Sequence, residues 1–233
     1  MVYVCGLPKY DRNKWNVGAD RIVVMPTWRP WETNAARIDF RDTDYYRFLE
    51  RIMDAIPPEL LDKVTILAHP LFQQHIIDAD FPLKKYMDVE SRYDDILKDT
   101  KLLVTDYSSI AYDAFYRGAN VVFYWSDKDE CMEQYGSHTT LMIDDDTAFG
   151  TVCYTTDELE RAIKDDYVKP QAFEHVRRYS QIVEFHDGKN TDRLVEMLRK
   201  DKIIPRRRLH FAPAKWADFL EGIFGNGEEF QYA

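Results

Sequence analysis

The sequence predicts an α/β protein with a Rossmann-like parallel sheet flanked by helices. Short apolar runs alternate with longer amphipathic segments along most of the 233 residues, which is the pattern of parallel strands joined by helices. The chain is 45% hydrophobic and can therefore bury a full core. No internal repeat and no low-complexity linker interrupts this alternation.

The predicted elements are defined by their length, their apolar spacing and the residues that end them. Four short runs rich in Val, Ile and Leu are typical of buried strands, and the longer segments carry apolar residues three or four positions apart. Pro57 and Pro58 stop the first helix, and Gly118 is a favourable left-handed residue after a later one. The strands are expected at residues 21–26, 64–68, 102–105 and 121–125. The helices are expected at residues 43–56, 93–97, 108–117, 156–163, 171–179 and 191–199.

Two segments depart from this pattern. Residues 126–151 are rich in Asp and Gly and are expected to be irregular. The composition shifts again near residue 206, so we divide the chain into a folded domain, 1–205, and a basic, amphipathic tail, 206–233. The tail has apolar residues at helical spacing, namely Trp216, Phe219, Leu220, Ile223 and Phe224. Such a face packs on the protein's own core or makes peripheral contact with the inner face of the plasma membrane, and the sequence leaves both open.

The bulk composition argues against several classes of protein. A net charge of -10 disfavours a general nucleic-acid binder, because such binding depends on clustered Lys and Arg. Cys5, Cys131 and Cys153 are odd in number and far apart, which predicts neither a disulfide framework nor a zinc site and fits a reducing compartment. No run approaches the roughly 18 apolar residues of a membrane span, and the start lacks a signal-peptide pattern. We therefore expect a cytoplasmic protein.

The most informative motif is the run from Thr105 to Ser109, TDYSS, between a predicted strand and a predicted helix. It lies at the carboxyl end of a parallel strand, where ligands of open α/β folds bind. The hydroxyls of Ser108 and Ser109 and the free amides of the first helical turn can donate to a diphosphate. The same residue types are also ordinary helix caps, and the local sequence leaves both interpretations open.

Two other predicted strand ends carry polar residues. His69 follows the strand 64–68, and we expect it on a strand that neighbours the TDYSS strand, where an imidazole can donate to phosphate oxygens or assist proton transfer. Thr27 and Arg29 follow the first strand, and a guanidinium suits a phosphate. The simpler alternatives are a histidine that caps local backbone and an exposed arginine without a ligand.

Further signals are weak or negative. The run from Asp187 to Lys189 is by itself a loop-to-helix turn, and the run from Asp144 to Asp146 is more typical of a solvated acidic loop than of a divalent-cation site. The chain contains no GxGxxG, GxxxxGK[ST], HExxH or GxSxG motif. These absences disfavour hydride transfer, P-loop hydrolysis, zinc proteolysis and α/β-hydrolase chemistry.

Together these pieces resemble the CDP-glycerol glycerophosphotransferase family, which builds teichoic acids and related glycerol-phosphate polymers. Six family motifs occur in order over roughly residues 2 to 200, and TDYSS is the most specific of them. They are Gly6 to Asp11 for G-x-P-R-x-D, Met25 to Arg29 for A-P-T-W-R, His69-Pro70 for H-P, Tyr93 to Leu97 with Thr105 to Ile110 for D-L-L…TDYSS-I, Phe123 to Gly136 for I-F-Y…D…Y…G, and Phe185 to Arg193 for F-x-D-G-x-x-x-x-R. Lys9 stands where the family has Arg, and residues 149–151 stand where it tends to have P-G-P.

The resemblance implies a GT-B architecture, in which two Rossmann-like domains face each other across a cleft. This chain is similar to the C-terminal, nucleotide-binding domain, and the N-terminal domain is missing. The implied reaction transfers glycerol phosphate from CDP-glycerol, or a related CDP-polyol, to a hydroxyl of a polymer or lipid-linked acceptor, with CMP released. It implies no cofactor and requires no metal.

The resemblance also suggests roles for individual residues. Ser108 and Ser109 would hold the diphosphate, His69 is the candidate catalytic residue, and Arg29 would stabilise charge. The full predicted substrate-binding set is Thr27, Arg29, His69, Asp106, Ser108, Ser109, Asp187 and Gly188. Two rival functions remain open, a GT-B glycosyltransferase that uses a sugar nucleotide and a non-catalytic nucleotide-binding module.

Overall fold

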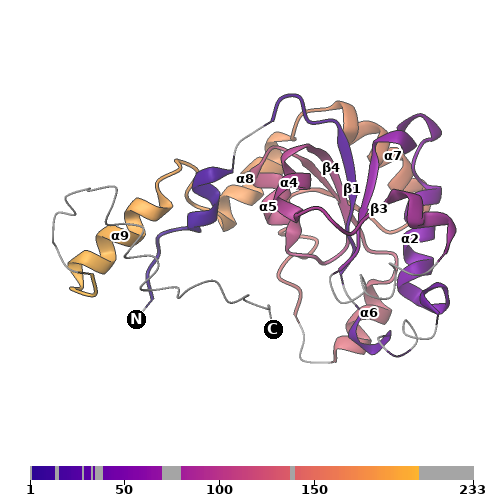
Figure 1. Ribbon diagram of the computed structural model, residues 1–233, viewed down its shortest axis with the longest axis horizontal. Helices are drawn as coiled ribbons and strands as arrows, with labels where there is room; N and C mark the ends of the chain where they lie inside the picture. The colour runs from indigo at the N-terminus through magenta and orange to yellow at the C-terminus, as the bar shows by residue number, and fades with distance from the viewer. Residues whose placement is uncertain are drawn as a thin grey trace.

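The computed structural model describes residues 2–13, 16–27, 29–32, 34, 39–69, 80–136 and 140–204. These residues form a six-stranded sheet in the order β3-β2-β1-β4-β5-β6, and every neighbouring pair is parallel (Figure 1). The strands are β1 Arg21–Val24, β2 Val64–Leu67, β3 Met87–Asp88, β4 Thr100–Thr105, β5 Asn120–Tyr124 and β6 Thr151–Cys153. The predicted tail, 206–233, lies outside the described residues.

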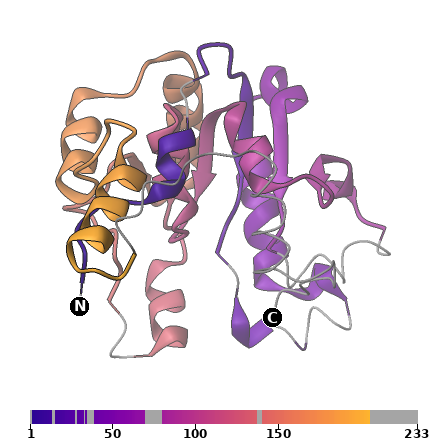
Figure 2. The ribbon, with the colours of Figure 1, turned by 60° about the vertical axis from the view of Figure 1, so that its left-hand side comes forward.

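Helices cover both faces of the sheet, as the two views show (Figures 1 and 2). The α-helices are α2 Asp44–Asp54, α4 Tyr93–Lys98, α5 Ile110–Tyr116, α6 Lys128–Tyr135, α7 Thr156–Val168, α8 Phe173–Ile182 and α9 Asn190–Lys200. The short 3-10 helices are η1 Pro8–Arg12, η2 Pro30–Glu32, η3 Phe40–Asp42, η4 Pro58–Lys63 and η5 Pro82–Tyr86. One buried cluster joins α2 and α7 to one face of the sheet, and a second joins α4, α5 and α8 to the other.

The strand sequences explain why both faces are covered. In β1, Ile22 and Val24 belong to the cluster under α2, whereas Val23 belongs to the cluster under α5, because successive side chains of a strand point to opposite faces. All three are fully buried. A strand that is apolar at every position therefore requires helices on both sides, as the continuous apolar runs predicted.

The predicted α/β fold is confirmed, with local corrections. The segment 126–151 is not one continuous element, as expected, but the helix α6 within it was not predicted. The short strands β3 and β6 were also not predicted. The expected left-handed residue after α5 is confirmed, since Gly118 has a φ of 95°.

The N-terminal segment packs against the C-terminal helix α9 and against α5 (Figure 2). The Asp11 carboxylate accepts hydrogen bonds from the backbone N–H groups of Asn190 at 2.9 Å and Thr191 at 2.7 Å, and so caps α9 from a distant part of the chain. Tyr10 is buried and stacks on Tyr116 of α5, with ring centroids 4.1 Å apart. The backbone of η1 is therefore held from both sides.

Replacing Asp11 by Ala is expected to lower the melting temperature at neutral pH, because the first N–H groups of α9 lose their acceptor. Hydrogen bonds from Thr191 and Asn190 lower the pKa of Asp11 below 3.8, so its stabilising effect is present above that pH and is lost as the pH falls through the lowered pKa. The melting temperatures of Asp11→Ala and of the parent should therefore converge at acidic pH. Glu196→Ala, an exposed change on α9, is the control and should leave melting unchanged. Equal melting of Asp11→Ala and the parent at pH 7 would contradict the capping role.

Candidate functional site

The strand order places a topological switch point between β1 and β4. The chain runs outward from β1 through β2 to β3, and then returns to β4 on the other side of β1. In open α/β sheets, ligands bind at the carboxyl ends of the strands at such a point. The residues that follow β1 and β4 meet there, which brings Thr27 and Arg29 against the turn that contains Asp106, Ser108 and Ser109.

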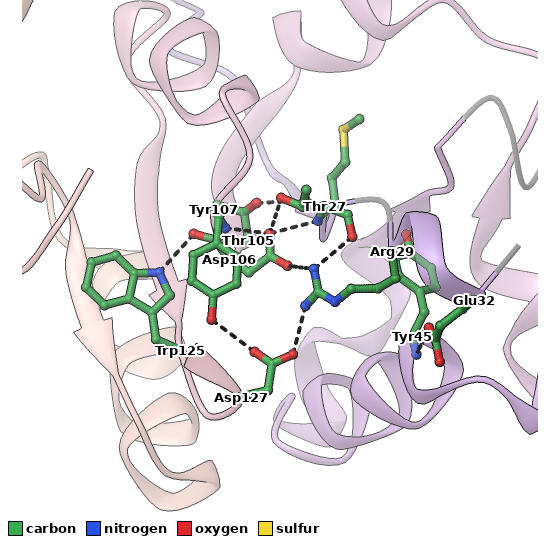
Figure 3. Close-up of polar contacts among 10 residues, drawn as sticks. Thr27, Arg29, Glu32, Tyr45, Thr105, Asp106, Tyr107, Trp125 and Asp127 are labelled. Atoms are coloured by element: carbon green, nitrogen blue, oxygen red, sulfur yellow. Dashed lines mark hydrogen bonds and ion pairs between the residues drawn. The ribbon is translucent and has the colours of Figure 1, made fainter. Parts of the chain in front are cut away.

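Arg29 is the centre of a buried ionic network at this edge (Figure 3). Its side chain is only 3% exposed. Nη1 lies 2.9 Å from Oδ2 of Asp106 and donates to the Thr27 carbonyl at 3.0 Å, while Nη2 donates to Oδ2 of Asp127 at 2.8 Å. The other carboxylate oxygen of Asp127 accepts from the Tyr107 hydroxyl at 3.1 Å. Both terminal nitrogens of the guanidinium are therefore engaged within the protein.

Asp106 joins the ends of three strands. Its carboxylate is fully buried, and Oδ1 accepts from the Thr27 backbone N–H at 2.7 Å and from the Thr27 hydroxyl at 2.6 Å. Its backbone carbonyl accepts from the indole N–H of Trp125 at 3.0 Å, just beyond β5. Figure 3 shows these groups converging from both sides of the switch point. The turn after β4 is thus held rigidly to β1 and β5.

The network carries more negative than positive charge. One guanidinium, that of Arg29, faces the carboxylates of Asp106 and Asp127, which leaves a net charge of -1. Burial opposes the charge on Arg29, but the two carboxylates outweigh it and raise its pKa, so the guanidinium stays ionised. Burial also raises the pKa of Tyr107, with a further contribution from Asp127, so its hydroxyl keeps its proton.

The Ser108–Ser109 turn carries hydrogen-bond donors that the protein leaves unused. Ser109 is the N-cap residue of α5 but makes no side-chain cap hydrogen bond, so the simple helix-cap interpretation is wrong for Ser109. Ser108 Oγ accepts only a long hydrogen bond, 3.4 Å, from Ile110 N–H. Within the described ranges, the backbone N–H groups of Ser108 and Ser109 donate to no acceptor. Two hydroxyls and two amides are thus available in one turn at the switch point.

His69 follows β2 at the same edge of the sheet and is half-buried. Burial lowers its pKa below 6.5, so the imidazole is mostly neutral at pH 7. The prediction that its strand neighbours the TDYSS strand is wrong, because β1 lies between β2 and β4. At about 4.8 Å per strand, β2 and β4 are about 10 Å apart, so Thr27 lies between His69 and the serine turn. The role of His69 stays a prediction.

Asp187 and Gly188 lie just before α9 rather than at a strand end. The Asp187 carboxylate pairs with Arg193 and accepts from the Lys189 backbone N–H at 3.1 Å, and Gly188 has a φ of 68°. No contact among the described residues joins either of them to the Ser108–Ser109 turn. Their assignment to the ribose or phosphate side stays a prediction.

Sequence reasoning gave no role to Asp127 or Trp125, although both belong to the network. Asp127 was the aspartate of the I-F-Y…D…Y…G resemblance, and that was its one signal in the sequence. Among the described residues, no three His, Cys, Asp or Glu side chains are grouped as metal ligands. Over the same ranges, no helix has the length and apolar character needed to cross a membrane.

Comparison with known proteins shows the family of the chain. Residues 10–200 match the family described as CDP-Glycerol:Poly(glycerophosphate) glycerophosphotransferase. The chain belongs to this family. The match confirms the resemblance found in the sequence motifs, and it spans the described structure from η1 to the end of α9.

One curated relative in sequence and one protein of similar fold can be compared with the chain. The chain is 29% identical over 138 residues to the minor teichoic acid biosynthesis protein GgaB of Bacillus subtilis (strain 168), a match that covers 53% of this chain and 15% of GgaB. The wall teichoic acid polymerase TagF has a similar fold, with a TM-score of 0.51 and 17% identity over 83% of this chain and 47% of TagF. A TagF variant soaked with CDPG gives a TM-score of 0.50 at 20% identity, over 86% of this chain and 49% of that one. The chain therefore spans about half the length of TagF and much less of GgaB.

Proposed function

We propose that this chain is the donor-binding domain of a GT-B glycerophosphotransferase, which transfers glycerol phosphate from CDP-glycerol to an acceptor hydroxyl. The observation that carries the proposal is the Ser108–Ser109 turn, with two hydroxyls and two N–H groups unused at the switch point. Membership of the family supports the choice of donor. In this reaction the acceptor oxygen bonds to the glycerol-bearing phosphorus, the bond to CMP breaks, and the hydroxyl proton passes to a base.

The site residues contribute positioning and hydrogen bonds. The hydroxyls and N–H groups of Ser108 and Ser109 bind the donor's diphosphate, and α5, with seven residues, adds only a small helix dipole. Asp106 and Arg29 keep the turn in place before the donor arrives, which lowers the cost of reaching the reactive geometry. The neutral imidazole of His69 donates to a phosphate oxygen or accepts the proton. This set of residues uses no metal.

The acceptor side belongs to another part of the protein in this proposal. The chain spans about half of TagF, and the described site consists of one sheet edge without an opposite wall. We therefore propose that the acceptor, a polymer or lipid-linked glycerol phosphate, binds to an N-terminal domain that faces this edge. The reaction would take place in the cytoplasm. The reaction would then require both domains.

The isolated chain is expected to bind CDP-glycerol but not to consume it. A ligand that binds only the native state at 100 times its Kd stabilises a protein by about 2.7 kcal/mol, so a thermal-shift series with CMP, CDP-glycerol, CDP-ribitol and UDP-sugars should show the largest shift with a CDP-polyol. Chromatography of the mixture should show no CMP release. A shift with a UDP-sugar alone would favour a glycosyltransferase. Rapid CMP production by this chain with acceptor would contradict the half-enzyme proposal.

A further inference from the structure

The charge of the candidate site does not favour the binding of an anionic donor. A diphosphate is an anion, yet the buried network beside the Ser108–Ser109 turn already has a net charge of -1. The guanidinium of Arg29 is neutralised and almost inaccessible, and burial lowers the pKa of His69, so its imidazole is mostly neutral at pH 7. A cation beside the neutral donors of the turn would therefore strengthen the binding of an anion there.

Lys9 is a cation placed one helical turn from these donors. Its Nζ lies 2.7 Å from Oδ1 and 2.9 Å from Oδ2 of Asp113 on α5. Asp113 is four residues after Ser109, and side chains four residues apart on a helix have Cβ atoms about 5–6 Å from each other on the same face. The long, flexible side chain of Lys9 can therefore bring its ammonium to the serine turn.

The backbone that carries Lys9 is fixed while its side chain is exposed. Tyr10 is buried against Tyr116, and Asp11 is bound to the N-terminus of α9, so η1 cannot easily shift. The Lys9 side chain is 56% exposed, in contrast to Asp113 at 16%. An ion pair of such an exposed ammonium contributes little to stability, so its exchange for another anion is easy.

We propose that Lys9 is a further donor-binding residue, whose ammonium moves from Asp113 to the diphosphate at the Ser108–Ser109 turn. This inference rests on the proposed function, and it deepens that proposal by assigning the positive charge of the site. Asp113 holds Lys9 next to the turn when no donor is bound, and competes with the donor for the same ammonium.

If Asp113 and the donor compete for Lys9, substitutions of Lys9 and of Asp113 should have opposite effects on the affinity for CDP-glycerol. Lys9→Met should weaken CDP-glycerol binding about tenfold, because a charge-assisted hydrogen bond is lost, whereas Asp113→Asn should tighten it by about two- to fivefold. In the Lys9→Met background, Asp113→Asn should have a smaller effect, since no ammonium is left to release. Lys9→Arg should keep most of the affinity. Isothermal titration calorimetry of the full chain with CDP-glycerol and with pyrophosphate measures all four variants.

Lys98→Met is the matched control, because Lys98 is 55% exposed and pairs with Asp95 on α4 at 2.5 Å. It should leave both affinities unchanged. A purely structural Lys9–Asp113 pair would give equal losses of melting temperature and no change in affinity for either variant, which would overturn the inference. If the parent binds pyrophosphate in a Lys9-dependent way but not CDP-glycerol, the inference stands and the proposed donor is wrong. If the parent binds neither CDP-glycerol nor pyrophosphate, both the role of Lys9 and the proposed function are wrong.

Discussion

Arg29→Met is expected to lower the free energy of unfolding by about 3 to 5 kcal/mol, the usual cost of removing one partner from a buried ion pair. The change leaves the carboxylates of Asp106 and Asp127 near each other without their shared cation. Asp127 loses a charge-assisted hydrogen bond and Asp106 loses its ion-pair partner, so the turn after β4 loses one of its links to the segment after β1. Urea denaturation followed by circular dichroism measures the loss directly.

The exposed pair of Arg47 with Asp44 on α2 provides the matched control. Its ion-pair distance of 2.7 Å is similar, but Arg47 is 53% exposed, so Arg47→Met should cost no more than about 1 kcal/mol. Arg29→Lys keeps the charge but cannot contact both carboxylates in the geometry of a guanidinium. Its free energy of unfolding should lie between those of the parent and of Arg29→Met. If Arg29→Met and Arg47→Met lose the same small amount of stability, the buried network does not hold the fold at the switch point.

Replacing both Ser108 and Ser109 by Ala is expected to weaken CDP-glycerol binding by about 30- to 150-fold. Each lost hydrogen bond to the charged diphosphate should cost about 1 to 1.5 kcal/mol, and about 1.4 kcal/mol corresponds to tenfold in affinity. Binding should not vanish, because the backbone N–H groups of the turn remain. His69→Ala should weaken the same ligand and combine non-additively with the serine changes, as expected for groups that share one site.

Calorimetry with the folded variant decides this second prediction, and melting must be followed in parallel. Because Ser109 makes no side-chain cap hydrogen bond, the double change should alter stability little, unlike the removal of a working cap. Ser180→Ala on α8 is the control for a serine whose hydroxyl already donates to the Val176 carbonyl. A folded double variant that binds CDP-glycerol as tightly as the parent would show that the diphosphate lies elsewhere.

The sequence predicted the sheet well where a strand has a continuous apolar run, because burial on both faces leaves such a run, as at residues 22–24. It did not predict α6, since Cys131 is the one buried residue of that short helix and most of its other residues are charged or polar. The two-residue strand β3 is too short to have a pattern. The order of the strands also could not be predicted, because the sequence of β1 does not show that it pairs with β2 on one side and β4 on the other.

The sequence predicted that several candidate residues follow strand ends, but not how they bond to one another. Thr27, Arg29 and the serine turn were expected at strand ends, and the structure brings them together at the switch point. The buried pairing of Arg29 could not be predicted, because its partner Asp127 is 98 positions away and an arginine looks the same in a sequence whether paired or exposed. The unused donors of Ser109 depend on backbone angles, which no motif specifies.

The contact between η1 and α9 links local opening of α9 to the position of the segment that carries Lys9. Asp11 and its partners Asn190 and Thr191 are 179 and 180 positions apart, so their contact closes a loop almost as long as the folded chain and should form after the sheet. Within α9, Asn190 is the one buried residue, so amide hydrogen exchange there should reveal local opening at a lower free energy than in β1 or β4. Each opening would release the segment that carries Lys9. The C-terminal helix is thereby coupled to the charge available at the Ser108–Ser109 turn.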